Sequence, residues 1–256
     1  MYRGYDLKIV DSDLGGGLRD NLSVIGQSVY DEHTRKIKRD LGKFLSPDGT
    51  VDGSKMQEAW FQDIKADIFL SHSHKNEPIA IMLAGLFKGV LGLSTFIDSC
   101  IWGYSLDLLR EIDNKFCKRE NGNYDYDKRN YSTSHVHMML ASALSKTIDN
   151  CECLLFLNTP ESVNADNVIH KTSSPWIYYE IAITNTIRQH NPRQKITTKA
   201  FGMDEGMRKI GGLPDFLYDL QNANLQQIDM KYLTNRIDLS MKNKKEHSLD
   251  VLYGLG

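Results

Sequence analysis

The chain has 256 residues, with 31 Lys and Arg against 33 Asp and Glu, and 41% of its residues are hydrophobic. The resulting net charge of −2 does not fit a general nucleic-acid-binding protein, which is usually strongly basic. The ordinary content of hydrophobic and charged residues excludes wholesale disorder. The longest mostly apolar run, 79–87, is shorter than the roughly 18 residues that a membrane span needs. We therefore expect neither nucleic acid nor membrane as a partner.

The N-terminal sequence has no apolar stretch of the kind found in secretory signals. The cysteines show neither a CxxC pair nor a repeated metal-binding spacing, which predicts free thiols and a cytoplasmic protein. They are Cys100, Cys117, Cys151 and Cys153.

The sequence predicts two regions. Residues 1–64 are expected to form an N-terminal, mostly helical extension, and residues 65–256 are expected to form the main domain. Three consecutive glycines at 15–17 interrupt any early element, and amphipathic spacing over 18–44 favours one or two helices. Ser54 is a candidate N-cap of a further short helix. The sequence assigns no function to this extension.

The main domain shows apolar strands that alternate with helices. The predicted strands are 66–71, 94–98, 151–157 and 195–201, and the predicted helices are 79–90, 105–116, 136–148, 175–188 and 230–251. The segment 99–103 is predicted as a loop with Ser105 as the next helix cap, and 118–134 as an exposed insertion. This alternation indicates an α/β fold with a parallel sheet covered on both faces.

Ligands of open α/β sheets bind at the carboxyl ends of the strands. The loops 71–76, 98–104 and 158–174 follow three predicted strands, so we expect them to converge. The chemistry of the protein is therefore sought in these loops and in the helix that follows the last of them.

Four segments in this order resemble a TIR (Toll/interleukin-1 receptor) domain. They are ADIFLSHSHKN (66–76), STFIDSCIWG (94–103), CECLLFLNTP (151–160) and SPWIYYEIA (174–182). The last resembles the Trp-x-x-x-Glu pattern of many bacterial TIR domains. The resemblance covers roughly residues 65–190 and implies a flavodoxin-like fold.

Many bacterial TIR domains cleave NAD between nicotinamide and ribose, so the resemblance implies NAD as substrate and requires no cofactor or metal. It places the catalytic glutamate at Glu180. It also implies that the loop from Asp98 to Tyr104 gates the site and mediates assembly. The candidate substrate-binding residues are Ser71, His72, Ser73, Lys75, Asp98, Trp102 and Trp176.

These residue types suit the chemistry. Nicotinamide leaves NAD as a neutral molecule, so one carboxylate near the ribose suffices to stabilise the oxocarbenium-like charge that develops. Trp176 and Glu180 are four residues apart and share one helix face, where the indole can line a pocket or stack on a planar ring. Lys75 and the adjacent helix start offer positive charge for a pyrophosphate.

Two alternatives belong to other classes. A non-catalytic TIR domain would use the loop from Asp98 to Tyr104 only to bind other TIR domains. A metal-dependent hydrolase would use the pairs His72/His74 and His135/His137, although no acidic residue accompanies either pair at motif spacing. His135 and His137 also begin a predicted helix, where side chains two apart diverge.

As a stand-alone TIR-like protein of this size, the chain is similar to the TIR proteins of antiphage systems such as Thoeris. The resemblance therefore implies an ADP-ribose-derived signal, a downstream effector that recognises it, and self-association through TIR domains. Hydrolysis and cyclisation share the first bond cleavage, so both remain open as the source of the product.

Overall fold

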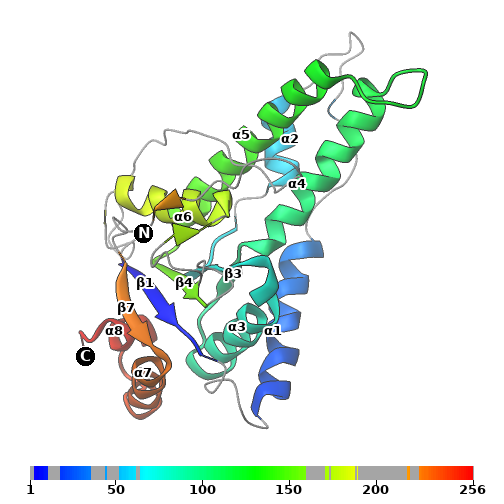
Figure 1. Cartoon of the computed structure of the whole chain (residues 1–256). Helices are drawn as coiled ribbons and strands as arrows, with labels where there is room; N and C mark the ends of the chain where they lie inside the picture. Colours follow the sequence, from blue (N-terminus) through cyan, green and yellow to red (C-terminus); the bar gives the residue numbers. More distant parts are fainter. Residues whose placement is uncertain are drawn as a thin grey trace.

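The computed structural model describes residues 3–10, 18–35, 44, 52–61, 64–159, 171–172, 174–187, 189, 218–219 and 225–255. Its centre is a parallel sheet of five strands in the order β3-β2-β4-β1-β7. The strands are β1 (Arg3–Lys8), β2 (Ile68–Ser71), β3 (Thr95–Ile97), β4 (Cys153–Asn158) and β7 (Gln226–Asp229). Helices flank the sheet (Figure 1). The predicted α/β, flavodoxin-like fold class is thereby confirmed.

The first strand of the chain lies inside this sheet. In β1, Tyr5 is in register with Leu155 of β4 on one side and with Gln226 of β7 on the other. In the flavodoxin-like order 2-1-3-4-5, a strand that follows the third in the chain takes this position. Residues 3–8, which were predicted to belong to a mostly helical extension, are instead part of the central sheet.

Eight α-helices are described. They are α1 (Leu18–Arg35), α2 (Gly53–Trp60), α3 (Glu77–Leu91), α4 (Ser99–Ile112), α5 (Tyr126–Asn150), α6 (Pro175–Thr186), α7 (Met230–Lys242) and α8 (Ser248–Tyr253). Among these described helices, none is both long and apolar enough to cross a lipid bilayer.

Helix ends follow local chemistry. Helix α3 has Pro78 in its first turn and ends at Gly92, whose φ of 68° is easily adopted without a side chain. Ser174 caps α6 as predicted, because its hydroxyl accepts the amide hydrogen of Ile177. The cap of α2 is Asp52, one turn before Lys55, and not the predicted Ser54.

Three predicted segments differ from the structure. Residues 99–103 are the first turns of α4 and not a loop, so Ser105 is not its cap. The predicted insertion 118–134 is helical from Tyr126 onward. The tail divides into α7 and α8, with β7 before them. The predicted strand 195–201 lies outside the described residues.

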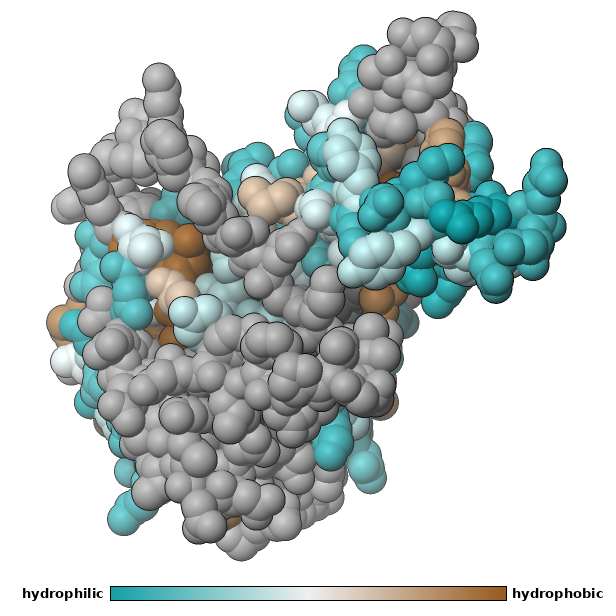
Figure 2. All heavy atoms as spheres, turned by 45° about the horizontal axis from the view of Figure 1, so that its top comes forward, coloured by the Kyte–Doolittle hydropathy of each residue, from teal (hydrophilic) through white to brown (hydrophobic). Residues whose placement is uncertain are grey.

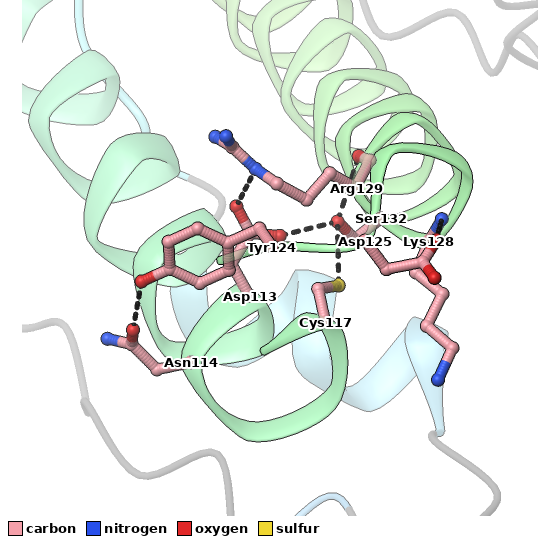
Figure 3. Close-up of polar contacts among 8 residues, drawn as sticks. All are labelled: Asp113, Asn114, Cys117, Tyr124, Asp125, Lys128, Arg129 and Ser132. Carbon is pink, nitrogen blue, oxygen red and sulfur yellow. Dashed lines mark hydrogen bonds and ion pairs between the residues drawn. The ribbon is translucent and has the colours of Figure 1, made fainter. Parts of the chain in front are cut away.

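Helices α4 and α5 extend away from the sheet as a two-helix arm (Figure 1). The outer part of the arm presents a largely hydrophilic surface (Figure 2). Beyond α4 the helix widens into a π-helical turn, η4 (Asp113–Cys117). The buried Asp113 carboxylate accepts hydrogen bonds from Arg129 Nε and Ser132 Oγ of α5, each at 2.8 Å (Figure 3). These bonds tie the two helices together near the tip.

Helix α1 packs directly against α3 through two glycines. A Cβ atom on Gly26 would lie 1.8 Å from the carbonyl oxygen of Ile81, and one on Gly85 would lie 1.8 Å from that of Leu22. Both obstacles are backbone atoms, which cannot rotate away. The two helices can therefore approach this closely only without side chains at these positions.

We expect Gly26→Ala and Gly85→Ala each to lower the free energy of unfolding by about 2 kcal/mol or more, because the added methyl forces the helices apart. Gly53→Ala is the matched control, because its Cβ would meet only the methyl group of Met139, at 3.6 Å. Urea unfolding followed by circular dichroism measures the effect. Equal stability of all three variants would contradict the close packing.

Candidate functional site

Glu180 lies on α6 and is fully buried. Its carboxylate Oε2 accepts a hydrogen bond of 2.6 Å from the hydroxyl of Ser71, the last residue of β2. Ser71 is also fully buried. The predicted catalytic residue is therefore joined directly to the carboxyl end of a central strand, the edge where α/β sheets bind their ligands.

Asp98 follows β3 at the same edge of the sheet and is fully buried too. Its carboxylate accepts the backbone amide hydrogen of His72 at 3.0 Å, and its other oxygen lies 2.5 Å from Nδ1 of the His72 ring. Ser71, His72, Asp98 and Glu180 thus form one buried polar cluster, which we call the acid cluster. It lies beside the boundary between β2 and β4, where the direction of the strand order reverses, which is the position at which this topology places its ligands.

Burial within the acid cluster shifts the pKa values of its three titratable side chains. Burial raises the pKa of Glu180 well above its ordinary value, and the nearby Asp98 raises it further. Burial also raises the pKa of Asp98. Burial lowers the pKa of His72 to about 4. At neutral pH the imidazole is therefore uncharged, and each of the two carboxyl groups holds its proton to a higher pH than an exposed acid would.

A second group of buried hydrogen bonds fixes the loop after β2. The side-chain amide of Asn76 donates to Ser73 Oγ at 2.9 Å and to Thr159 Oγ1 at 2.5 Å. Thr159 directly follows β4, so this amide joins the ends of two neighbouring strands. Ser73 was predicted as a site residue, whereas the roles of Asn76 and Thr159 were not predicted. Their chain separation of 83 residues gives no local signal of the contact.

Helix α6 is anchored on α5. The Tyr179 hydroxyl lies 2.5 Å from Ser145 Oγ and donates to the carbonyl oxygen of Ala141 at 3.0 Å. The half-buried Trp176 ring meets His137 edge-on, with ring centroids 5.5 Å apart. These contacts set the rotation of α6 and so direct Glu180 toward the sheet.

The other predicted site residues are more scattered. Lys75 is exposed on the short helix η3 (His74–Asn76), outside the acid cluster. Trp176 lies one turn before Glu180, as expected from its spacing, but its ring is packed against His137. Trp102 belongs to α4, and its side chain lies outside the described residues.

The histidine pairs do not support a metal centre. His72 is buried beside Asp98, whereas His74 is exposed. His135 meets the Tyr131 ring and His137 meets Trp176. Within the part of the chain that the structure describes, no group of three or more His, Cys, Asp or Glu residues could hold a metal ion.

The comparisons with known proteins give no relative. No family model, no curated protein and no solved structure matches this chain.

We expect Glu180→Gln to stabilise the fold increasingly as the pH rises above about 4.3, the ordinary pKa of an unfolded glutamate. In the native state the raised pKa of Glu180 makes ionisation unfavourable, so the wild type loses stability between the unfolded and the folded pKa. The uncharged amide avoids this loss and can still accept the hydrogen bond of Ser71.

Urea unfolding between pH 5 and pH 8 measures this difference, whose slope is at most about 1.4 kcal/mol per pH unit for one proton. Glu58→Gln, at an exposed position of α2, is the control and should change stability by less than about 0.5 kcal/mol. A Glu180→Gln variant that is less stable than the wild type at pH 8 would show that Glu180 is ionised in the native protein.

Proposed function

We propose that this protein cleaves NAD at the bond between nicotinamide and ribose, with Glu180 as the catalytic carboxylate. The observation that carries the proposal is the burial of Glu180 beside Ser71 and Asp98 at the carboxyl edge of a parallel sheet. Strongly shifted carboxyl groups at such an edge are typical of catalytic sites. The resemblance of four sequence segments to TIR domains supplies the substrate.

The proposed reaction needs one carboxylate. The bond between the ribose C1′ and the pyridinium nitrogen breaks, and its electron pair leaves with nicotinamide, which is neutral once released. Positive charge then develops on the ribose, and the ionised Glu180 stabilises it electrostatically. Water or a hydroxyl group captures C1′ and loses a proton, which completes hydrolysis or cyclisation respectively.

The positive charge of the bound substrate would change the pKa of Glu180. In the closed site, burial and the nearby Asp98 favour the protonated form of Glu180. A cationic pyridinium beside the carboxyl group favours the ionised form and lowers its pKa. In this proposal NAD binding thus releases a proton and produces the carboxylate that the reaction uses.

The biological setting is proposed from the TIR resemblance alone. In it, the protein is cytoplasmic and associates with itself through its TIR domain. The product is an ADP-ribose-derived signal, which a downstream effector recognises during antiphage defence.

We expect purified protein at high concentration to release nicotinamide from NAD, and Glu180→Gln to reduce the rate by about 10²–10³. Chromatography of free nicotinamide measures the rate, and mass spectrometry of the remaining product separates hydrolysis from cyclisation. Glu152→Gln is the matched control. Glu152 is also a buried glutamate, but it directly precedes β4 and so lies at the edge of the sheet opposite the acid cluster.

Two results would contradict the assignment. Nicotinamide release that survives Glu180→Gln would remove the catalytic role of Glu180. No release by the wild type under any condition that promotes assembly would favour the alternative of a non-catalytic interaction module.

A pH profile tests the protonation of Glu180. Because the free protein must lose a proton from a carboxyl group of raised pKa, kcat/KM should fall on acidification while the pH is still well above 4.3. Asp98→Asn removes a negative charge beside Glu180. The fall of kcat/KM on acidification should therefore move to lower pH, even if the variant is slower overall. An acidic limb at the same pH in both proteins would show that this carboxyl group does not limit the rate.

A further inference from the structure

The C-terminal part of α1 contacts residues on both sides of Asp98. The Tyr104 hydroxyl of α4 donates a 2.8 Å hydrogen bond to the carbonyl oxygen of Thr34. The Tyr30 hydroxyl donates a 3.2 Å hydrogen bond to Glu77 Oε2, at the start of α3. Glu77 directly follows the loop that holds His72. These two bonds therefore tie α1 to the segment that follows β2 and to the segment that follows β3. Both segments contribute residues to the acid cluster.

Two weaker contacts come from the same part of α1. The thiol of Cys100, in the first turn of α4, lies 4.0 Å from the carbonyl oxygen of Tyr30. The His33 ring is 5.9 Å from the ring of Phe96 in β3. Residues 30–34 thus touch positions before and after Asp98. We call this set of contacts the α1 clasp.

Helix α1 is a rigid base for these contacts. Gly26 and Gly85 bring its backbone against that of α3, as described above. The other elements around the acid cluster are tied elsewhere: α6 to α5 through Tyr179, and the loop after β2 to Thr159. The start of α4 is bonded to α1 through the hydroxyl of Tyr104.

The first turns of α4 are also a weak helical segment by themselves. Gly103 lies within them, and glycine destabilises helices more than any residue except proline. Their buried side chains, Ile101 and Tyr104, hold them in place, and the hydroxyl of Tyr104 is bonded to α1. Releasing α1 would therefore loosen this segment before the rest of the sheet edge.

Glu180 and Asp98 have no exposed surface, so a substrate can reach them only when a neighbouring element moves. We propose that the α1 clasp holds the start of α4 over the acid cluster and so keeps the site closed until α1 is displaced. This inference rests on the proposed function for what enters the site. The closure itself has a test that does not depend on NAD.

Cys100 reports the opening directly. Its thiol is buried in the first turn of α4, and burial raises its pKa, so alkylation requires a local opening. Cys151 and Cys153, buried at the start of β4, are internal references. The experiment treats the full chain with N-ethylmaleimide and follows each thiol by peptide mass spectrometry.

Tyr30→Phe and Tyr104→Phe remove one hydroxyl group each and keep the rings. We expect each to raise the alkylation rate of Cys100 about 3- to 10-fold, with Cys151 and Cys153 unchanged. The double variant should give about the product of the two effects. Tyr126→Phe is the matched control, because Tyr126 is an exposed tyrosine at the start of α5. Nicotinamide release from NAD should rise in parallel with Cys100 alkylation.

Each other outcome has a distinct meaning. Unchanged Cys100 alkylation in both variants, or equal acceleration of all three thiols, would overturn the clasp. Faster Cys100 alkylation with slower nicotinamide release would also overturn it, because the closed form would then be the active one. Faster Cys100 alkylation with no nicotinamide release from any variant or from the wild type would support the clasp and overturn NAD cleavage.

Discussion

The acid cluster brings two carboxyl groups together away from bulk solvent, and the rest of the site follows from this constraint. Like charges in a dry space cannot both ionise cheaply, so each group needs a fixed partner. Ser71 supplies a hydroxyl to Glu180, and the amide of His72 supplies a hydrogen to Asp98. Both partners are consecutive residues at the end of β2. A single strand end therefore holds two acids that come from α6 and from the turn after β3.

The sequence predicted the parts of the fold that carry a continuous apolar signal. Strands β2, β3 and β4 are almost wholly buried, and their apolar runs are visible without a structure. The edge strand β7 has one buried side chain, that of Ile228, so no such run exists. Strand β1 mixes Arg3, Asp6 and Lys8 with its buried residues. Its position between β4 and β7 depends on pairing over most of the chain, which local spacing does not encode.

The site divides in the same way. The helix that carries Glu180 was predictable, because Ser174 and Pro175 mark its start. The bond from Ser71 to Glu180 was not, since it joins residues 109 positions apart. The start of α4 was predicted as a loop, with Ser105 as the cap of the following helix, and Gly103 within this segment does disfavour a helix. The structure makes it helical because Ile101 and Tyr104 are buried and α1 accepts the hydroxyl hydrogen of Tyr104.

Closure and protonation of the proposed site are physically linked. In the closed form, the loss of water is the largest cause of the raised pKa of Glu180. A movement of α4 that admits substrate also admits water and carries Asp98 with it, since Asp98 directly precedes the helix. Both effects favour the ionised carboxylate. One displacement of α4 would thus admit NAD and favour the charge that its cleavage requires, whereas burial in the closed protein favours the protonated, unreactive form of the acid.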